Sequence, residues 1–267
     1  WEWVHPYAEK PTVPFSLANA LGCRPETWDS LPRLVRQLNE LSDFFPFGVR
    51  REKTRVACLY SQPSQRFAPE RIDAWCAAVA ALELNQVRAD AVFEEQLASG
   101  EDCRIGDYDV IVAAGVDEVL PQTREFLRRW MDEGGRLVVV DATLDRDEYG
   151  ERLSPGIPDV LGHRNCLRVE AKMSEPSSAN ALLECLAQAG IRPFVKVTDG
   201  TTGTHPSFIR VVRAVNAEGL TGWFVANYSE TSRLLELEAA ELGGVTAVQP
   251  FGTNAWPVVN GRMTVLV

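Results

Sequence analysis

Short apolar stretches alternate with segments of helical periodicity between residues 54 and 199, and this alternation constrains the fold more than any other feature. The stretches "TRVACLYS", "YDVIVAAG" and "RLVVVDA" are nearly continuous apolar runs of strand length. Between them, "APERIDAWCAAVAALELNQ" and "LPQTREFLRRWMDEGG" repeat apolar residues at helical spacing. Strands that are apolar on both faces and are separated by helices predict a parallel sheet covered on both sides. We therefore predict a doubly wound α/β domain.

The two helical segments each have an expected buried face. These faces are Ile72, Trp75, Val79 and Leu82 in the first segment, and Phe126, Leu127, Trp130 and Met131 in the second. Gly134 and Gly135 offer the left-handed residue that ends the second helix. Further along the chain we expect a strand around "RADAVFEEQL", a long loop after "RLVVVDA", a helix at "SSANALLECLAQAG" and a strand at "RPFVKVTDG".

The rhythm of the sequence changes after "TDGTTGTHPS". Short segments such as "FIRVVRAV" and "LTGWFVANYS" follow, separated by turns and without a helical stripe, which indicates a small antiparallel β-sandwich domain. The segment at the start is rich in proline and aromatic residues and continues into one amphipathic helix. We expect three parts: a linker and helix over 1–50, the α/β domain over 51–203 and the β domain over 204–267.

Charge and cysteine usage exclude several classes of partner. The net charge of -10 would repel nucleic acid and an anionic membrane surface, and no apolar run approaches the roughly 20 residues that span a bilayer. The six cysteines are widely spaced without a C-x-x-C pair, so we expect no structural zinc. Cys58, Cys76 and Cys185 are expected to be reduced apolar fillers, and a cytoplasmic location is favoured.

The acidic loop "DATLDRDEYG" is the most suggestive polar feature. Asp141 follows an apolar strand, and ligands of open parallel sheets bind beyond the carboxyl ends of strands. Asp145, Asp147 and Glu148 could join it around magnesium or calcium, but the loop lacks the glycine that a calcium-binding EF-hand loop needs at its sixth position. A solvated loop with local caps is the leading hypothesis. The alternatives are a contact with another subunit or domain, and a metal or catalytic role.

Other catalytic signatures are missing from the sequence. Neither a nucleophile elbow nor a glycine-rich phosphate loop follows the predicted strands, so we expect no catalytic residue, no cofactor and no metal in this chain. The three histidines lie in separate loops and are expected to make local hydrogen bonds. Trp1, Trp3 and Trp256 lie in proline-rich or turn-rich segments, where they could seal an interface or stack on a sugar.

Several motifs resemble a known family when they are taken in order. They are "TRVACLYSQPSQRF", "YDVIVAAGVDEVLPQTREFLRRWMDEGGRLVVVDATLDRDEYG" and "FIRVVRAVNAEGLTGWFVANYSETSRLLELEAAEL". This order resembles the region that follows the catalytic barrel of family-42 β-galactosidases. The resemblance implies a trimerisation domain, with a fold like class I glutamine amidotransferases and flavodoxin, followed by a small C-terminal β domain. It also makes residues 1–50 the expected tail of a catalytic barrel.

The resemblance implies an accessory role, because the two catalytic glutamates of that family belong to a barrel that we do not find in this sequence. The implied partners are further copies of the chain in a trimer, and carbohydrate through the parent catalytic domain. The first residue is Trp1, which favours a piece of a larger protein. The alternatives are a stand-alone amidotransferase-like hydrolase with a site at Asp141, Asp147 and Glu148, and a carbohydrate-binding module that uses Trp256 or Trp223.

Overall fold

The computed structural model describes part of the chain. The described residues are 39, 54–99, 108–153, 160–173, 175, 177–206, 208–215, 219, 221–227 and 234–239, and the strand residues 247–248, 255–256, 258–259 and 262–266. The expected linker and helix over 1–50, with Trp1 and Trp3, therefore lie outside the described residues, apart from Asn39. No helix in the described part of the chain is long and apolar enough to cross a membrane.

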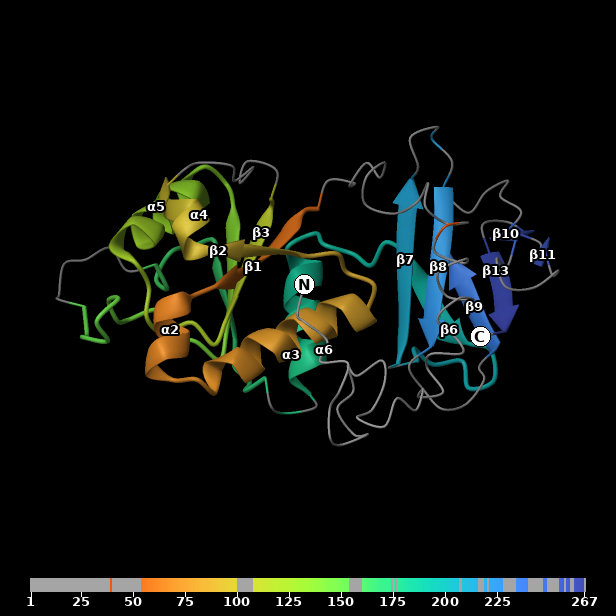
Figure 1. Cartoon of the computed structure of the whole chain (residues 1–267), viewed down its shortest axis with the longest axis horizontal. Coiled ribbons are helices and arrows are strands. Elements are labelled where there is room, and N and C mark those ends of the chain that lie inside the picture. Colours follow the sequence, from red (N-terminus) through yellow and green to blue (C-terminus); the bar gives the residue numbers. More distant parts are fainter. Residues whose placement is uncertain are drawn as a thin grey trace, which may run out of the picture. The chain divides into compact units, whose positions relative to one another are not determined.

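A five-stranded parallel sheet forms the centre of the α/β part (Figure 1). Its strands are β1 (Val56–Tyr60), β2 (Asp90–Phe93), β3 (Val110–Ala114), β4 (Arg136–Val140) and β5 (Cys166–Val169). The strands lie in the order β2-β1-β3-β4-β5 and every neighbouring pair is parallel. This is the order of a flavodoxin-like doubly wound sheet, so the predicted fold class is confirmed.

Helices cover both faces of this sheet. They are α2 (Gln62–Phe67), α3 (Arg71–Leu84), α4 (Glu94–Ser99), α5 (Pro121–Asp132) and α6 (Ser178–Gln188). One core cluster joins α3 and α6 to alternate residues of β1, β3 and β4, and a second joins α4 and α5 to the other residues of these strands. All five residues of β3 are buried. The continuous apolar character of the strands thus follows from burial on both faces.

The buried face of α3 differs from the predicted one. Leu82 is buried as expected, but Ile72, Trp75 and Val79 are only partly buried, and the residues that face the core are mainly alanines, namely Ala74, Ala78 and Ala81. Small side chains let the helix approach the sheet closely. A Cβ atom added to Gly115 at the end of β3 would lie 2.6 Å from the carbonyl oxygen of Arg71, so the backbones already touch there.

The predicted face of α5 is confirmed at three of its four positions. Leu127, Trp130 and Met131 are buried, whereas Phe126 is partly exposed. Gly134 has a φ of 108° just beyond the helix, which is the expected left-handed residue. The next glycine has a different role, because a Cβ atom added to Gly135 would lie 2.2 Å from Cε2 of Trp130. The tryptophan ring therefore occupies the space that a side chain would need.

Four other predictions need correction. The segment "RADAVFEEQL" is a strand only to Phe93, and α4 begins at Glu94. The long loop after β4 contains the edge strand β5. The strand at "RPFVKVTDG", β6 (Lys196–Asp199), forms as expected, but it pairs antiparallel with β9 rather than extending the parallel sheet. Cys58 and Cys185 are buried thiols, but Cys76 is exposed on α3.

The C-terminal part contains small antiparallel sheets, as predicted. Their strands are β7 (Ile209–Val215), β8 (Thr221–Asn227), β9 (Leu234–Glu238), β10 (Ala247–Val248), β11 (Ala255–Trp256), β12 (Val258–Val259) and β13 (Arg262–Leu266). One sheet has the order β12-β13-β9-β6, and β7–β8 and β10–β11 form two-stranded sheets. The expected boundary near residue 204 stays a prediction.

A single buried side chain joins the end of α3 to β7. Gln86 has a φ of 60°, and its amide nitrogen donates to the carbonyl oxygen of Ile209 at 2.8 Å. The Gln86 amide oxygen accepts from the backbone N–H of Val211, also at 2.8 Å. Arg210 lies between these two residues and pairs with Glu83 at 2.8 Å. The side-chain amide of Gln86 thus makes the two hydrogen bonds that a neighbouring strand would make.

Candidate functional site

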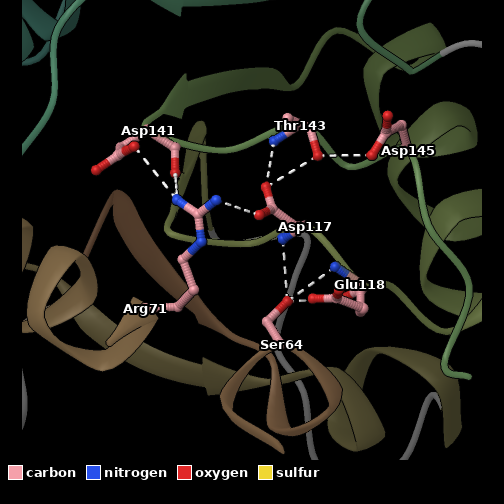
Figure 2. Close-up of polar contacts among 7 residues, drawn as sticks. All are labelled: Ser64, Arg71, Asp117, Glu118, Asp141, Thr143 and Asp145. Atoms are coloured by element: carbon pink, nitrogen blue, oxygen red, sulfur yellow. Dashed lines mark hydrogen bonds and ion pairs between the residues drawn. The ribbon is translucent and has the colours of Figure 1, made fainter. Parts of the chain in front are cut away.

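The place where a doubly wound sheet binds ligands is the point at which its strand order reverses, beyond the carboxyl ends of the strands. In the order β2-β1-β3-β4-β5 this point lies between β1 and β3. The residues that gather there follow β1, β3 and β4 directly or begin α3. We define the switch-point network as Ser61, Ser64, Arg71, Asp117, Glu118, Asp141 and Thr143 (Figure 2 shows all of them except Ser61, together with Asp145).

In this network, two converging backbone N–H groups donate hydrogen bonds to the side-chain hydroxyl of Ser64. The N–H of Asp117 and the N–H of Glu118 donate to Oγ of Ser64 at 3.0 and 2.9 Å, and this hydroxyl donates to the carbonyl oxygen of Glu118 at 3.0 Å (Figure 2). Ser61 Oγ donates to the same carbonyl at 2.7 Å and accepts from the N–H of Ser64. Converging N–H groups are suited to an anion or an oxyanion. Here they bind a hydroxyl of the chain itself.

Arg71, the first residue of α3, is paired on two sides. One guanidinium nitrogen forms an ion pair with Asp117, and another donates to the carbonyl oxygen and to Oδ1 of Asp141 at 3.1 and 3.3 Å (Figure 2). Asp117 is further held by Thr143, whose N–H and hydroxyl both donate to Oδ1 of Asp117, at 2.8 and 2.9 Å. Arg71 and Asp117 are the cation and the carboxylate best placed for chemistry, and each therefore neutralises the charge of the other.

The structure brings only part of the predicted acidic loop into this network. Asp141 takes part with a φ of 48°, and Oδ1 of Asp145 lies 2.7 Å from the Thr143 hydroxyl, whose single proton is shared between Asp117 and Asp145. Asp147 instead caps its own loop, because its Oδ1 accepts from the N–H groups of Tyr149 and Glu151. Glu148 is half-buried. No group of three or more His, Cys, Asp or Glu side chains that could hold a metal ion occurs among the described residues.

Two of the three histidines lie in described segments and make local hydrogen bonds. Nε2 of His163 lies 3.0 Å from Asp132, and its Nδ1 accepts from the N–H of Asn165. The ring nitrogens of His205 lie 3.2 and 3.0 Å from the carbonyl oxygens of Val197 and Leu84. These contacts tie loops to neighbouring elements. Trp256 belongs to β11, but its side chain lies outside the described part, so its predicted contact role stays a prediction.

The pocket beside Asp141 is small and polar. It has a volume of about 310 Å³, lies at the carboxyl ends of β4 and β5, and carries charges of both signs. The charged residues that line it are Asp141, Arg168, Glu170, Lys172 and Glu175. Small-molecule sites are typically lined mainly by apolar and aromatic side chains with a few polar groups. The lining of this pocket is instead mainly polar and charged.

Sequence reasoning missed one buried carboxyl near this edge of the sheet. Glu94 begins α4 with no exposed surface, and burial raises the pKa of its carboxyl from 4.5 to about 7. The hydrogen bond from the N–H of Leu120 and the nearby hydroxyls of Ser61 and Thr123 oppose this shift, and the neighbouring Glu95 adds to it. The available signal is the position of Glu94 where β2 ends and α4 begins, but the segment "VFEEQL" has the pattern of a single strand and hides this junction.

Comparisons with known proteins show which enzymes share this fold. No family model and no curated protein matches the sequence. Among solved structures, the β-galactosidase from Bacillus circulans sp. alkalophilus superposes with a TM-score of 0.65 and 13% identity, over 94% of this chain and 45% of that chain. The GH42 exo-carrageenase from Bacteroides ovatus gives 0.61 and 14%, over 89% of this chain and 31% of that chain.

A third similar structure is the β-galactosidase from the Antarctic haloarchaeon Halorubrum lacusprofundi, with a TM-score of 0.56 and 12% identity, over 94% of this chain and 44% of that chain. The chain thus spans less than half the length of each of these three structures. Its fold is that of a region found in GH42-type glycoside hydrolases, and this likeness concerns the fold alone.

Proposed function

We propose that this chain is a non-catalytic accessory and oligomerisation region of a glycoside hydrolase similar to β-galactosidase. The proposed partners are further copies of the chain, in a trimer, and the catalytic barrel of the parent enzyme. Carbohydrate would be hydrolysed by that barrel and not by the groups described above.

The closed switch point is the observation that carries this proposal. An enzyme that used this edge of the sheet would need free hydrogen-bond donors for its substrate and an acid, base or nucleophile within reach. The two N–H groups after β3 are instead filled by Ser64, and Arg71 is paired with Asp117 and Asp141. The groups that would bind a ligand hold the ends of three strands together.

The fold comparison supports the choice of parent enzyme. Two β-galactosidases and an exo-carrageenase contain a region of this fold, and in each it makes up less than half of the solved chain. A region that recurs beside different substrates is better suited to assembly than to substrate choice.

Two measurements on the purified chain test the two halves of the proposal. Incubation with a chromogenic β-galactoside should give no turnover above a buffer blank, with an intact family-42 β-galactosidase as the positive control. Light scattering over a concentration series should give three times the monomer mass of 29.6 kDa. Robust turnover would refute the non-catalytic role, and a monomer at every concentration would refute the assembly role.

A further inference from the structure

Glu94 connects two helices through a buried carboxyl. It is the first residue of α4, and its Oε2 accepts from the N–H of Leu120, the residue that precedes α5, at 2.7 Å. The hydroxyl of Thr123 in α5 donates to the Glu94 carbonyl oxygen at 3.4 Å. Among the described atoms, the second carboxyl oxygen, Oε1, has no hydrogen-bond partner. The side chain of Glu94 thus makes one of these two polar contacts between α4 and the start of α5, and it is the one that can ionise.

The charges around Glu94 do not neutralise it. On its own helix, Glu95 is a second acid. On the segment before α5, Glu118 is also a buried carboxylate. On α5, the guanidinium of Arg124 donates to the carbonyl oxygen of Leu144. Asp117, also on the segment before α5, is buried and paired with Arg71. The other charged residues of α2, α5 and β2 are Arg66, Glu125, Arg128, Arg129 and Asp132, all exposed, and Asp90, which accepts from the Tyr108 hydroxyl.

Burying a carboxylate without a cation costs much more free energy than burying the neutral acid. The protonated form keeps an oxygen that accepts from Leu120, so α4 stays packed while Glu94 is neutral. The ionised form gains by reaching water, which requires α4 to leave its place. Burial is the largest cause of the raised pKa of Glu94, and hydrogen bonding only partly offsets it.

We propose that Glu94 is a pH-sensitive latch, whose neutral carboxyl holds α4 against the start of α5 and whose ionisation releases α4. The released helix would uncover Leu97, which is buried in the core cluster shared by α4 and α5. The latch depends on local contacts alone, so it stands or falls independently of the proposed accessory role.

Hydrogen exchange on the full chain tests the latch. Peptides that cover α4 are followed by mass spectrometry from pH 5 to pH 8, with rates corrected for the intrinsic pH dependence of exchange. The opening constant of α4 should rise by on the order of 10- to 100-fold over this range, because ionisation favours the open form once the pH exceeds the pKa of the exposed acid. Peptides from β3 serve as the internal reference and should not follow this rise.

Two matched variants separate the latch from a general effect of charge. Glu94→Gln keeps an acceptor for Leu120 but cannot ionise, so the corrected exchange of α4 should not change with pH. Glu95→Gln removes a charge from the exposed neighbour and should keep the pH dependence. A pH-independent α4 in the unaltered chain, or the same pH dependence in both variants, would overturn the proposal.

An NMR titration keeps the proposal testable if Glu94→Gln does not fold. In the unaltered chain, the carboxyl carbon of Glu94 should titrate with a midpoint near 7. A midpoint near the ordinary value of 4.5 would overturn the latch, because the carboxyl would then already be ionised at pH 6 without any release of α4.

Discussion

The ion pair between Arg71 and Asp117 offers a direct measure of how strongly the switch-point network holds the sheet edge together. The perturbation is a double-mutant cycle with Arg71→Met, Asp117→Asn and the double variant. Methionine keeps much of the length of Arg71 without its charge, and asparagine keeps an oxygen that accepts from Thr143. The cycle therefore isolates the charge interaction between the two side chains.

The burial of the pair sets the expected magnitude. The side chain of Arg71 is 27% exposed and that of Asp117 is 11% exposed. Exposed pairs contribute roughly 0.2–1 kcal/mol, and removing one partner of a fully buried pair costs roughly 3–5 kcal/mol. The Arg71–Asp117 pair lies between these limits, and Asp141 shares the same guanidinium. We expect a coupling energy of about 2 kcal/mol, with Asp117→Asn alone costing about as much.

Urea unfolding of the four proteins, followed by tryptophan fluorescence and extrapolated linearly, gives the free energies. The control is the same cycle on Arg55 and Asp109, an ion pair of the same chemistry whose side chains are 59% and 50% exposed. Its coupling energy should stay below about 1 kcal/mol. The reasoning is refuted if the Arg71 cycle gives no more coupling than this exposed control.

Three further outcomes follow from the buried groups. Gly135→Ala should lower the free energy of unfolding by about 3 kcal/mol in thermal or urea melts, because its Cβ would clash with the Trp130 ring, and this cost should nearly vanish in a Trp130→Leu background; an equal cost in both backgrounds would contradict it. Because the folded-state pKa of Glu94 is raised, its stabilising contribution is present below pH 4.5 and is lost as the pH rises to about 7. Glu94→Gln should therefore raise stability by up to about 3 kcal/mol at pH 8 and much less at pH 5, and a gain independent of pH would contradict the raised pKa of Glu94. Burial also raises the pKa of Cys58 to about 12, so peptide mapping after brief alkylation at pH 8 should find Cys76 modified and Cys58 intact; early labelling of Cys58 would contradict its burial.

Apolar patterning is enough to predict the three central strands of the sheet and the helices α3, α5 and α6. The strands β1, β3 and β4 are buried on both faces, and a continuous apolar run reports that condition directly. The predicted buried face was wrong on α3, where alanines rather than larger apolar residues face most of the core. On α3 the larger side chains lie at the margin of the core, because the close approach near Gly115 admits only small residues on the central face.

Pairing between strands could not be predicted in the same way. The segment Lys196–Asp199 has the composition of a strand in either sheet, and its partner β9 lies some forty residues further along the chain. The edge strand β5 is short and only its last residue, Val169, is buried, so the apolar signal is weak. Local sequence contains the tendency to extend, but the choice of neighbour depends on the whole fold.

The candidate site was predicted in part for a related reason. Asp141 was identified because it directly follows an apolar strand. Its partner Arg71 is 70 residues away, and Asp117 meets Ser64 across 53 residues. These pairs become visible only when the order of β1, β3 and β4 is known, since that order places their loops side by side.

The contact between Gln86 and β7 also bears on how the molecule avoids pairing with other copies through that strand. An exposed strand offers its N–H and carbonyl groups to any second chain, which is a common route to aggregation. The Gln86 amide already occupies the carbonyl of Ile209 and the N–H of Val211. A second chain that added itself there would first have to displace a buried side chain held by two hydrogen bonds, so one glutamine gives this stretch of β7 a barrier against uncontrolled fibre growth.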